Sequence, residues 1–454
     1  MSSFQPPISS TETRQTCLEQ EHEFFSIPPA RRVPAEILEK IFSIICLPEF
    51  GGYSLDIDEN REEKTIPSVA PTLALSQVSS RWRQTAKGFP KLWSSIKVCL
   101  SDFTVVGMGA EPLLGLYLTR SQEHPVDLKF VYFEPHRDPS IRDVLLPHLR
   151  HVVKLDISKA EPQERSIPVP EWLAQGLSDA AKLAELRLDH NHLHYIRAPY
   201  HQLTSLQILN VICEPLTPTL RFCTKLRALQ ITGSSRILPS RFDHIQLPHL
   251  RHLSLSCPHE THFTWHINHL TLPSLVSLEI ISPSLRSFAR TLELIHRSSC
   301  RLSQLVLKMS VIDVLDAALT EFLWACPELS QLQVHILKDV SKKEGPKTFT
   351  HQLLDVLSHS PRAVAPKLVE LSVLEEDEAI DSESADTLLD MSETRLGAFD
   401  AGLIGELVPS PRWDLRFGGL SVCTADVLEA FNARLEKLAE KGFACSIEWA
   451  ETLV

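Results

Sequence analysis

The chain has 454 residues, of which 43% are hydrophobic and 22% charged, and its formal net charge is -12. This ordinary globular composition excludes wholesale disorder, while the length predicts several domains or a repeat array. The excess of acidic over basic residues argues against a nucleic-acid-binding protein, because neutralising phosphates requires clustered Lys and Arg.

The N-terminal stretch MSSFQPPISSTETRQ has neither a basic start nor an apolar centre, so it does not resemble a signal peptide. No apolar run approaches the roughly 18 residues that span a bilayer. The ten cysteines are scattered without a CxxC pair, which fits a reducing compartment. We therefore expect residues 1–26 to form a disordered tail, and the protein to lie in the cytoplasm, the nucleus or both, without membrane contact.

Residues 33–46 are predicted to form the first helix. Pro34 suits its first turn, where a missing N–H costs nothing, and Pro48 prevents its continuation. Its apolar side chains lie at Val33, Ile37, Leu38, Ile41, Phe42 and Ile45. That stripe is too wide for a lone surface helix, so we expect part of it to contact a partner.

The next segments are a predicted loop and a second predicted helix. Residues 51–68, GGYSLDIDENREEKTIPS, are glycine-led, acidic and poor in apolar residues, which indicates an inserted loop. Residues 71–88 favour a helix whose apolar face includes Trp82, and FPKLW follows, ending at Trp93. Both tryptophans are interpreted as core or junction residues, with a role as contact hot spots as the alternative.

In this order, VPAEILEKIF, LALSQVSSRWRQTA and PKLWSSI resemble the F-box. The F-box pattern is Leu-Pro-x-Glu-Ile-Leu-x-x-Ile-Phe, then a Leu-rich helix closing in Cys-Arg-x-Trp, then Leu-Trp. The chain departs from it at Val33 in place of Leu, at Ser80 in place of Cys, and in the insert of residues 47–70, which looks like the fungal variant. The resemblance covers residues 27–95.

The resemblance implies a binding role for the first helix. In F-box proteins this helix docks on a Skp-type adaptor, which joins it to a cullin-based ubiquitin ligase. The adaptor-binding side chains implied by the resemblance are Val33, Pro34, Ile37, Leu38, Ile41 and Phe42.

The remaining chain contains an internal repeat. KLAELRLDHNHL at 182–193 fits the leucine-rich-repeat pattern L-x-x-L-x-L-x-x-N-x-L, and weaker copies continue as far as APKLVELSVL. The central apolar positions are predicted at Leu155, Leu186, Leu209, Leu229, Leu253, Leu278, Leu305, Leu332 and Leu371. The fold class is therefore α/β: a small helical F-box domain, then an irregular leucine-rich-repeat solenoid over residues 96–454. This solenoid is expected to be a horseshoe with parallel strands on its concave face and a C-terminal helical cap at 424–442.

Side chains between the leucines should face the inner surface of the horseshoe. The predicted target-binding residues are Arg187, Asp189, Asn210, Gln230, Ser254, Glu279, Lys308, Gln333 and His335. This mixture of charges and amides suits a protein target more than a small substrate, and plain solvated surface is the alternative.

No sequence motif indicates catalysis. G-x-S-x-G, Walker and Gly-rich dinucleotide motifs are absent, so we expect no enzyme activity and no cofactor. Two groups of histidines suggest a metal site, but their spacing does not match the zinc-binding motif H-E-x-x-H, so we expect no metal site. The histidines of the two groups are His190, His192, His194, His201, His259, His262, His266 and His269. The acidic residues 374–393 are predicted to be a solvated, mobile insertion, with a docking strip for a basic partner as the alternative.

The sequence thus predicts a substrate-recognition adaptor of a Skp-cullin-F-box type ubiquitin ligase. Its partners would be the Skp-type adaptor, through it a cullin, and a protein substrate. A ligase-independent repeat scaffold is the alternative, and a metal-dependent hydrolase built on the histidines is a third hypothesis.

Overall fold

The structure of the protein is a computed structural model with two compact units, Met1–Leu155 and Asp156–Val454. It describes residues 33–47, 53–58, 68–100, 110–132, 139–159, 169–189, 196–209, 217–233, 244–256, 267–281, 285–310, 316–337, 349–359, 364–379, 386–387, 389–395, 412–419, 425–440 and 444–449. The predicted domain bounds of 27–95 and 96–454 stay a prediction, and the predicted tail of residues 1–26 lies outside the described residues.

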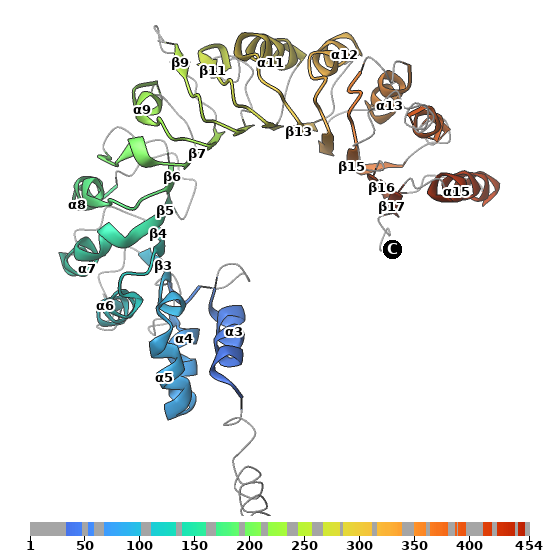
Figure 1. Cartoon of the computed structure of the whole chain (residues 1–454). Coiled ribbons are helices and arrows are strands. Elements are labelled where there is room, and N and C mark those ends of the chain that lie inside the picture. The colour runs from blue at the N-terminus through green and yellow to red at the C-terminus, as the bar shows by residue number, and fades with distance from the viewer. Residues whose placement is uncertain are drawn as a thin grey trace, which may run out of the picture. The chain divides into compact units, whose positions relative to one another are not determined.

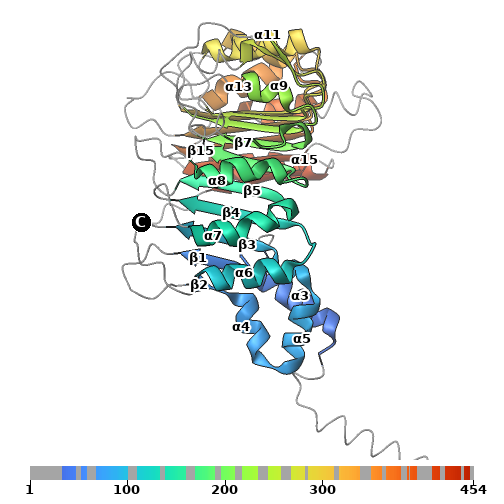
Figure 2. The ribbon, with the colours of Figure 1, turned by 90° about the vertical axis from the view of Figure 1, so that its left-hand side faces the viewer.

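Unit 1 combines short helices with paired strands (Figures 1 and 2). In chain order its elements are α3 (Ala35–Cys46), β1 (Leu55–Asp58), β2 (Ser68–Val69), α4 (Pro71–Val78), α5 (Ser80–Gly88), the 3-10 helix η2 (Pro90–Trp93), β3 (Ser95–Leu100), α6 (Ala110–Ser121), β4 (Val126–Tyr132), α7 (Pro139–Leu145) and the 3-10 helix η3 (Leu146–His151). Strand β5 (Val152–Lys159) contains the boundary between the units.

Local capping explains where the first helices begin. Pro34 precedes α3 and Pro71 opens α4, two positions at which proline removes no helical hydrogen bond. The Ser79 hydroxyl accepts a hydrogen bond from the Trp82 amide at 3.1 Å and so caps α5. The helix predicted at 33–46 is confirmed.

The insert predicted as a loop contains two strands. Strand β1 pairs in parallel with β3, Leu55 opposite Ile96, and antiparallel with β2. Leu55 is fully buried. The loop prediction was wrong for β1 because its alternation Leu-Asp-Ile-Asp is a strand pattern, which the acidic composition obscured. It was also wrong at Ser68, the first residue of β2.

Trp93 lies at the centre of unit 1. Its side chain is fully buried, and its indole N–H donates to the Ala86 carbonyl at 2.7 Å. Its ring meets the Tyr117 ring edge-on at 4.9 Å, and the Arg120 guanidinium lies 4.4 Å from its centroid. Trp93 thereby connects α5 with α6, as a junction residue should, whereas Trp82 is only partly buried.

Unit 2 is built on a large parallel sheet. Its strands are β6 (Glu185–Asp189), β7 (Ser205–Leu209), β8 (Ala228–Thr232), β10 (His252–Ser256), β12 (Ser277–Ile281), β13 (Gln304–Ser310), β14 (Gln331–Leu337), β15 (Glu370–Ala379), β16 (Arg412–Gly419) and β17 (Ala444–Trp449), in this spatial order. Each strand pairs with the next in parallel. Strands β9 (Ile245–Gln246) and β11 (Leu270–Thr271) form a separate pair.

The helices of unit 2 lie along one side of this sheet (Figure 1). They are α8 (Glu171–Gly176), α9 (Thr217–Phe222), α11 (Leu285–Ser298), α12 (Asp316–Trp324), α13 (Phe349–His359) and α15 (Ala425–Glu440), with the 3-10 turns η4 (Leu177–Asp179) and η6 (Tyr200–Gln202). We call the opposite side of the sheet the open face. The mixed α/β class and the parallel sheet are as predicted, and α15 confirms the helix expected at 424–442.

The leucines of neighbouring strands share one row. The paired and buried side chains are Leu186, Leu206, Leu229, Leu253, Leu278, Leu305, Leu332 and Leu371. In β7 the row contains Leu206, so the prediction of Leu209 was wrong by three residues. That shift moves a residue to the other face of a strand, and Leu209 is indeed only half-buried.

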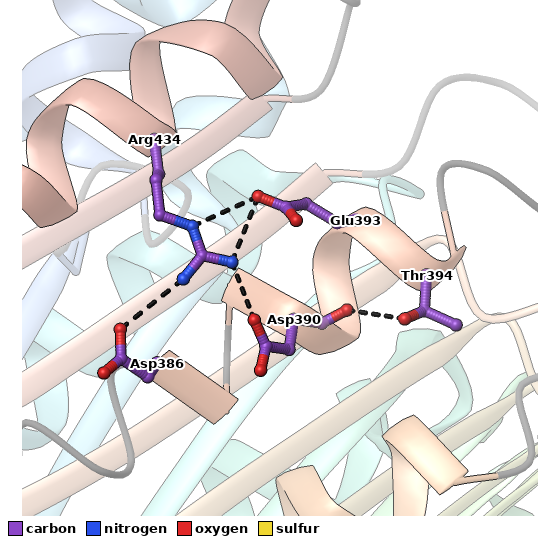
Figure 3. A network of polar contacts seen from close by, with 5 residues as sticks. All are labelled: Asp386, Asp390, Glu393, Thr394 and Arg434. Carbon is purple, nitrogen blue, oxygen red and sulfur yellow. Dashed lines mark hydrogen bonds and ion pairs between the residues drawn. The ribbon is translucent and has the colours of Figure 1, made fainter.

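The acidic segment 374–393 is not a free insertion where the structure describes it. Its start continues β15, and its end is helical at 386–387 and 389–393. Arg434 of α15 donates to Asp390 at 2.7 Å and to Glu393 at 3.2 Å, and Asp386 lies 3.5 Å from its guanidinium (Figure 3). The basic group that these carboxylates meet therefore belongs to the chain itself. The carboxylates are exposed, as a solvated segment predicts, and the predicted mobility stays a prediction.

Buried Arg395 secures the same helical segment. It is 3% exposed and donates to the carbonyls of Leu357, Val364 and Ala365 at 2.9–3.2 Å. Burial lowers the pKa of this guanidinium to about 10. The segment is thus held from within by Arg395 and from outside by Arg434.

Candidate functional site

One face of α3 exposes four isoleucines. Ile37 is 44% exposed, Ile41 38%, and two further isoleucines are more open, Ile44 at 57% and Ile45 at 45%. At helical spacing of three and four residues they form one apolar face, which we call the docking face. Single exposed apolar residues are common on protein surfaces, but four exposed isoleucines on one face of a short helix form a contiguous apolar patch, which is typical of a binding surface.

The opposite side of α3 faces the interior of unit 1. Leu38 is 1% exposed, and Phe42 and Cys46 are fully buried. The Phe42 ring meets Trp82 edge-on, with 5.1 Å between centroids. Two residues implied as adaptor contacts, Leu38 and Phe42, are therefore core residues in this structure.

The remaining residues of the predicted adaptor site lie at the start of α3. Pro34 is exposed and its carbonyl accepts hydrogen bonds from the Ile37 and Leu38 amides. The Val33 carbonyl accepts a 2.6 Å hydrogen bond from the guanidinium of Arg81 on α5. Sequence reasoning missed the positioning role of Arg81, as well as Ile44 on the docking face.

The predicted target-binding residues occupy two rows of the open face. The register places Arg187, Gln230, Ser254, Glu279 and Gln333 in one row. The row two residues further along the strands contains Asp189, Lys308 and His335. Asn210 lies outside the described residues, and Gln207 holds the β7 position of the first row.

Charged residues on the open face are paired with one another. Glu279 accepts hydrogen bonds from the Ser254 hydroxyl and the Lys308 ammonium, each at 2.7 Å. Burial alone would raise the pKa of Glu279, but these hydrogen bonds outweigh it and the pKa is lowered. Arg187 lies 3.7 Å from Asp156. This surface combines polarity with local neutrality, as protein contacts do.

The described histidines and cysteines bear on two kinds of chemistry, metal binding and attack by a thiolate. In the ranges given above, no group of three or more His, Cys, Asp or Glu is placed to hold a metal ion. Of the eight histidines named from the sequence, only His201 and His269 belong to these ranges. Burial raises the pKa of Cys223 and of Cys326 to about 12, which disfavours the thiolate that a nucleophile requires.

No helix among the described residues has the length and apolar character needed to cross a membrane. No protein-family model matches the chain, and no curated protein matches it either. The arrangement of the described residues therefore carries the functional argument: an apolar helix face in unit 1 and a polar sheet face in unit 2.

Proposed function

We propose that the chain is a substrate-recognition adaptor of a Skp-cullin-F-box type ubiquitin ligase. Helix α3 docks on the Skp-type adaptor, and unit 2 is a leucine-rich-repeat solenoid that binds the target protein. The observation that carries the proposal is the docking face, whose isoleucines are 38–57% exposed on a helix that is otherwise anchored by Leu38 and Phe42. The aligned leucine rows of unit 2 support the repeat assignment.

The energy available from the docking face sets a limit on this contact. Full burial of an isoleucine contributes about 1.5–3 kcal/mol, and about half of each of the four is already hidden. Docking would therefore gain about 3–6 kcal/mol, against an association cost of about 4–15 kcal/mol. The adaptor must contact further residues of unit 1, and exposed Val78 at the end of α4 supplies one apolar candidate.

The second candidate function is a repeat scaffold without a ligase connection. The observation that favours it is the open face of unit 2, which offers paired charges and amides whether or not α3 has a partner. In that case α3 and its neighbours would only stabilise the fold of unit 1. The two functions differ in one measurable property, stable binding of a Skp-type adaptor.

Co-purification of the full chain with a Skp-type adaptor tests the proposal. Ile37→Asp combined with Ile41→Asp should abolish binding, because it places two charges in an apolar contact. Phe222→Asp combined with Trp324→Asp is the matched control, since these side chains are 64% and 55% exposed in unit 2 and should leave adaptor binding unchanged. Adaptor binding that survives the isoleucine substitutions contradicts the docking assignment. A wild-type chain that binds no adaptor favours the scaffold.

A further inference from the structure

A strip of basic side chains crosses the entry to two neighbouring strands of unit 2. We call it the basic strip, and it consists of Lys225, Arg227, His249, Arg251 and His252. All five side chains are exposed, and they lie just before or at the start of β8 and β10. Such a cluster stands out in a chain whose net charge is -12.

The backbone fixes these residues side by side. The amides of Arg251 and His252 both donate to the Arg227 carbonyl, at 2.8 and 2.9 Å. Leu226 and Leu250 are buried beneath the strip, so the chain is anchored at the same point in both strands. Neighbouring strands lie about 4.8 Å apart, which makes the two arginines adjacent at their backbones.

The positive charges of the strip are not neutralised by the described residues. Within the ranges that the structure describes, no hydrogen bond or ion pair engages any of the five side chains. Other cations of unit 2 do have carboxylate partners, for example Lys308 with Glu279 at 2.7 Å and Lys367 with Glu328 at 2.6 Å. The equivalent positions on the flanking strands carry uncharged Thr204 and Val276.

We propose that the basic strip binds an acidic segment of a protein partner, a run of Asp and Glu residues in extended conformation. Guanidinium groups bind carboxylates through two parallel hydrogen bonds, and two adjacent arginines offer two such forks. Alternate side chains of an extended peptide are about 6.6–6.8 Å apart, a separation that two long arginines on neighbouring strands can span. This surface goes beyond the proposed function and does not depend on adaptor binding.

A single-stranded nucleic acid is the other polyanion that a basic strip could attract. The strip contains no Phe, Tyr or Trp side chain, and its only rings are the small imidazoles of His249 and His252. Stacking on large aromatic rings is a major source of affinity for single strands. The net charge of -12 also repels a long polyanion more strongly than a short peptide. These two features favour the acidic peptide.

Fluorescence anisotropy of a labelled oligoglutamate peptide with the full chain tests the inference, and an oligoglutamine peptide of equal length is the ligand control. We expect the glutamate peptide to bind, salt to weaken it, and Arg227→Gln with Arg251→Gln to weaken it by at least about tenfold. Arg142→Gln with Arg290→Gln removes the same net charge from two other surface positions and should change binding less than about twofold.

Three results would overturn the inference. The first is equal weakening by the two pairs of arginine substitutions, which would show an effect of net charge alone. Binding of the glutamine peptide as tight as that of the glutamate peptide is the second. The third is tighter binding of a single-stranded oligonucleotide of the same charge. Because no adaptor enters this assay, its failure is separate from a failure of the proposed function.

Discussion

Truncation of two consecutive residues of α3 should separate folding from docking. Phe42 is fully buried against Trp82, whereas Ile41 is 38% exposed on the docking face. Phe42→Ala removes a buried ring and leaves a cavity. Ile41→Ala removes a side chain that is partly in water, and alanine favours the helix.

The structure predicts different losses of local stability for the two substitutions. Phe42→Ala should cost about 3–5 kcal/mol of local stability, because the transfer and cavity contributions add at a buried site. Ile41→Ala should cost at most about 1 kcal/mol, since its burial is incomplete and the gain in helix propensity offsets part of the loss. The difference of roughly 3 kcal/mol corresponds to more than a hundredfold change in the local opening equilibrium.

Amide hydrogen exchange, followed by mass spectrometry on peptides from α3 and α5, measures this difference locally. A local probe is needed because a chain of two compact units has no single well-defined free energy of unfolding. We expect Phe42→Ala to reduce protection of both helices and Ile41→Ala to preserve it while weakening adaptor binding. Equal loss of protection in the two variants, or full protection in Phe42→Ala, would refute the assignment of core and docking sides.

Two further predictions concern charged contacts of unit 2. Arg434→Gln should increase hydrogen exchange of α15 by an amount equivalent to about 1 kcal/mol or less, because the three carboxylate partners of Arg434 are roughly half exposed or more. This effect should vanish near 1 M salt. A difference in exchange between variant and wild type that persists at high salt would contradict the prediction. Lys308→Met should raise the pKa of Glu279, because burial remains when the ammonium is lost. A carboxyl whose pKa is lowered in the folded state contributes stability at pH values above its ordinary pKa. That contribution is lost as the pH falls through the lowered pKa. The variant should therefore be less stable at neutral pH and should lose less stability than the wild type as pH falls through this range. Carboxyl chemical shifts by NMR give the pKa directly, and a pKa that does not rise would contradict the reasoning.

The sheet of unit 2 was predictable because its signal is local. The strands from β6 to β14 alternate between inward apolar residues and outward residues that are mostly polar, and the repeat interval brings the leucines into one row. The error in β7 shows the limit of this signal. LTSLQIL has leucines at intervals of three, so two of them fit the same pattern, and only the pairing of Leu206 with Leu229 decides between them.

The docking side of α3 was not predictable in the same way. Apolar residues cover more than half of the helix circumference, so the periodicity permits either side to face the core. Contacts with residues 40 and 48 positions away decide it, since Trp82 packs on Phe42 and Arg81 donates to the Val33 carbonyl. Arg434 likewise meets carboxylates 41–48 residues away, and composition alone contains no sign of that pairing.

The pairing of charges changes which part of unit 2 is the stronger candidate for target recognition. A partner that binds Lys308 through its ammonium must first break a 2.7 Å contact with Glu279 and leave that half-buried carboxylate without its cation. A partner of Arg187 competes with Asp156 in the same way. Arg227 and Arg251 have no such contact to break among the described residues, and they can keep their hydration until a partner replaces it. The open face therefore suits contacts through shape and amides, while affinity for charged groups concentrates at the basic strip.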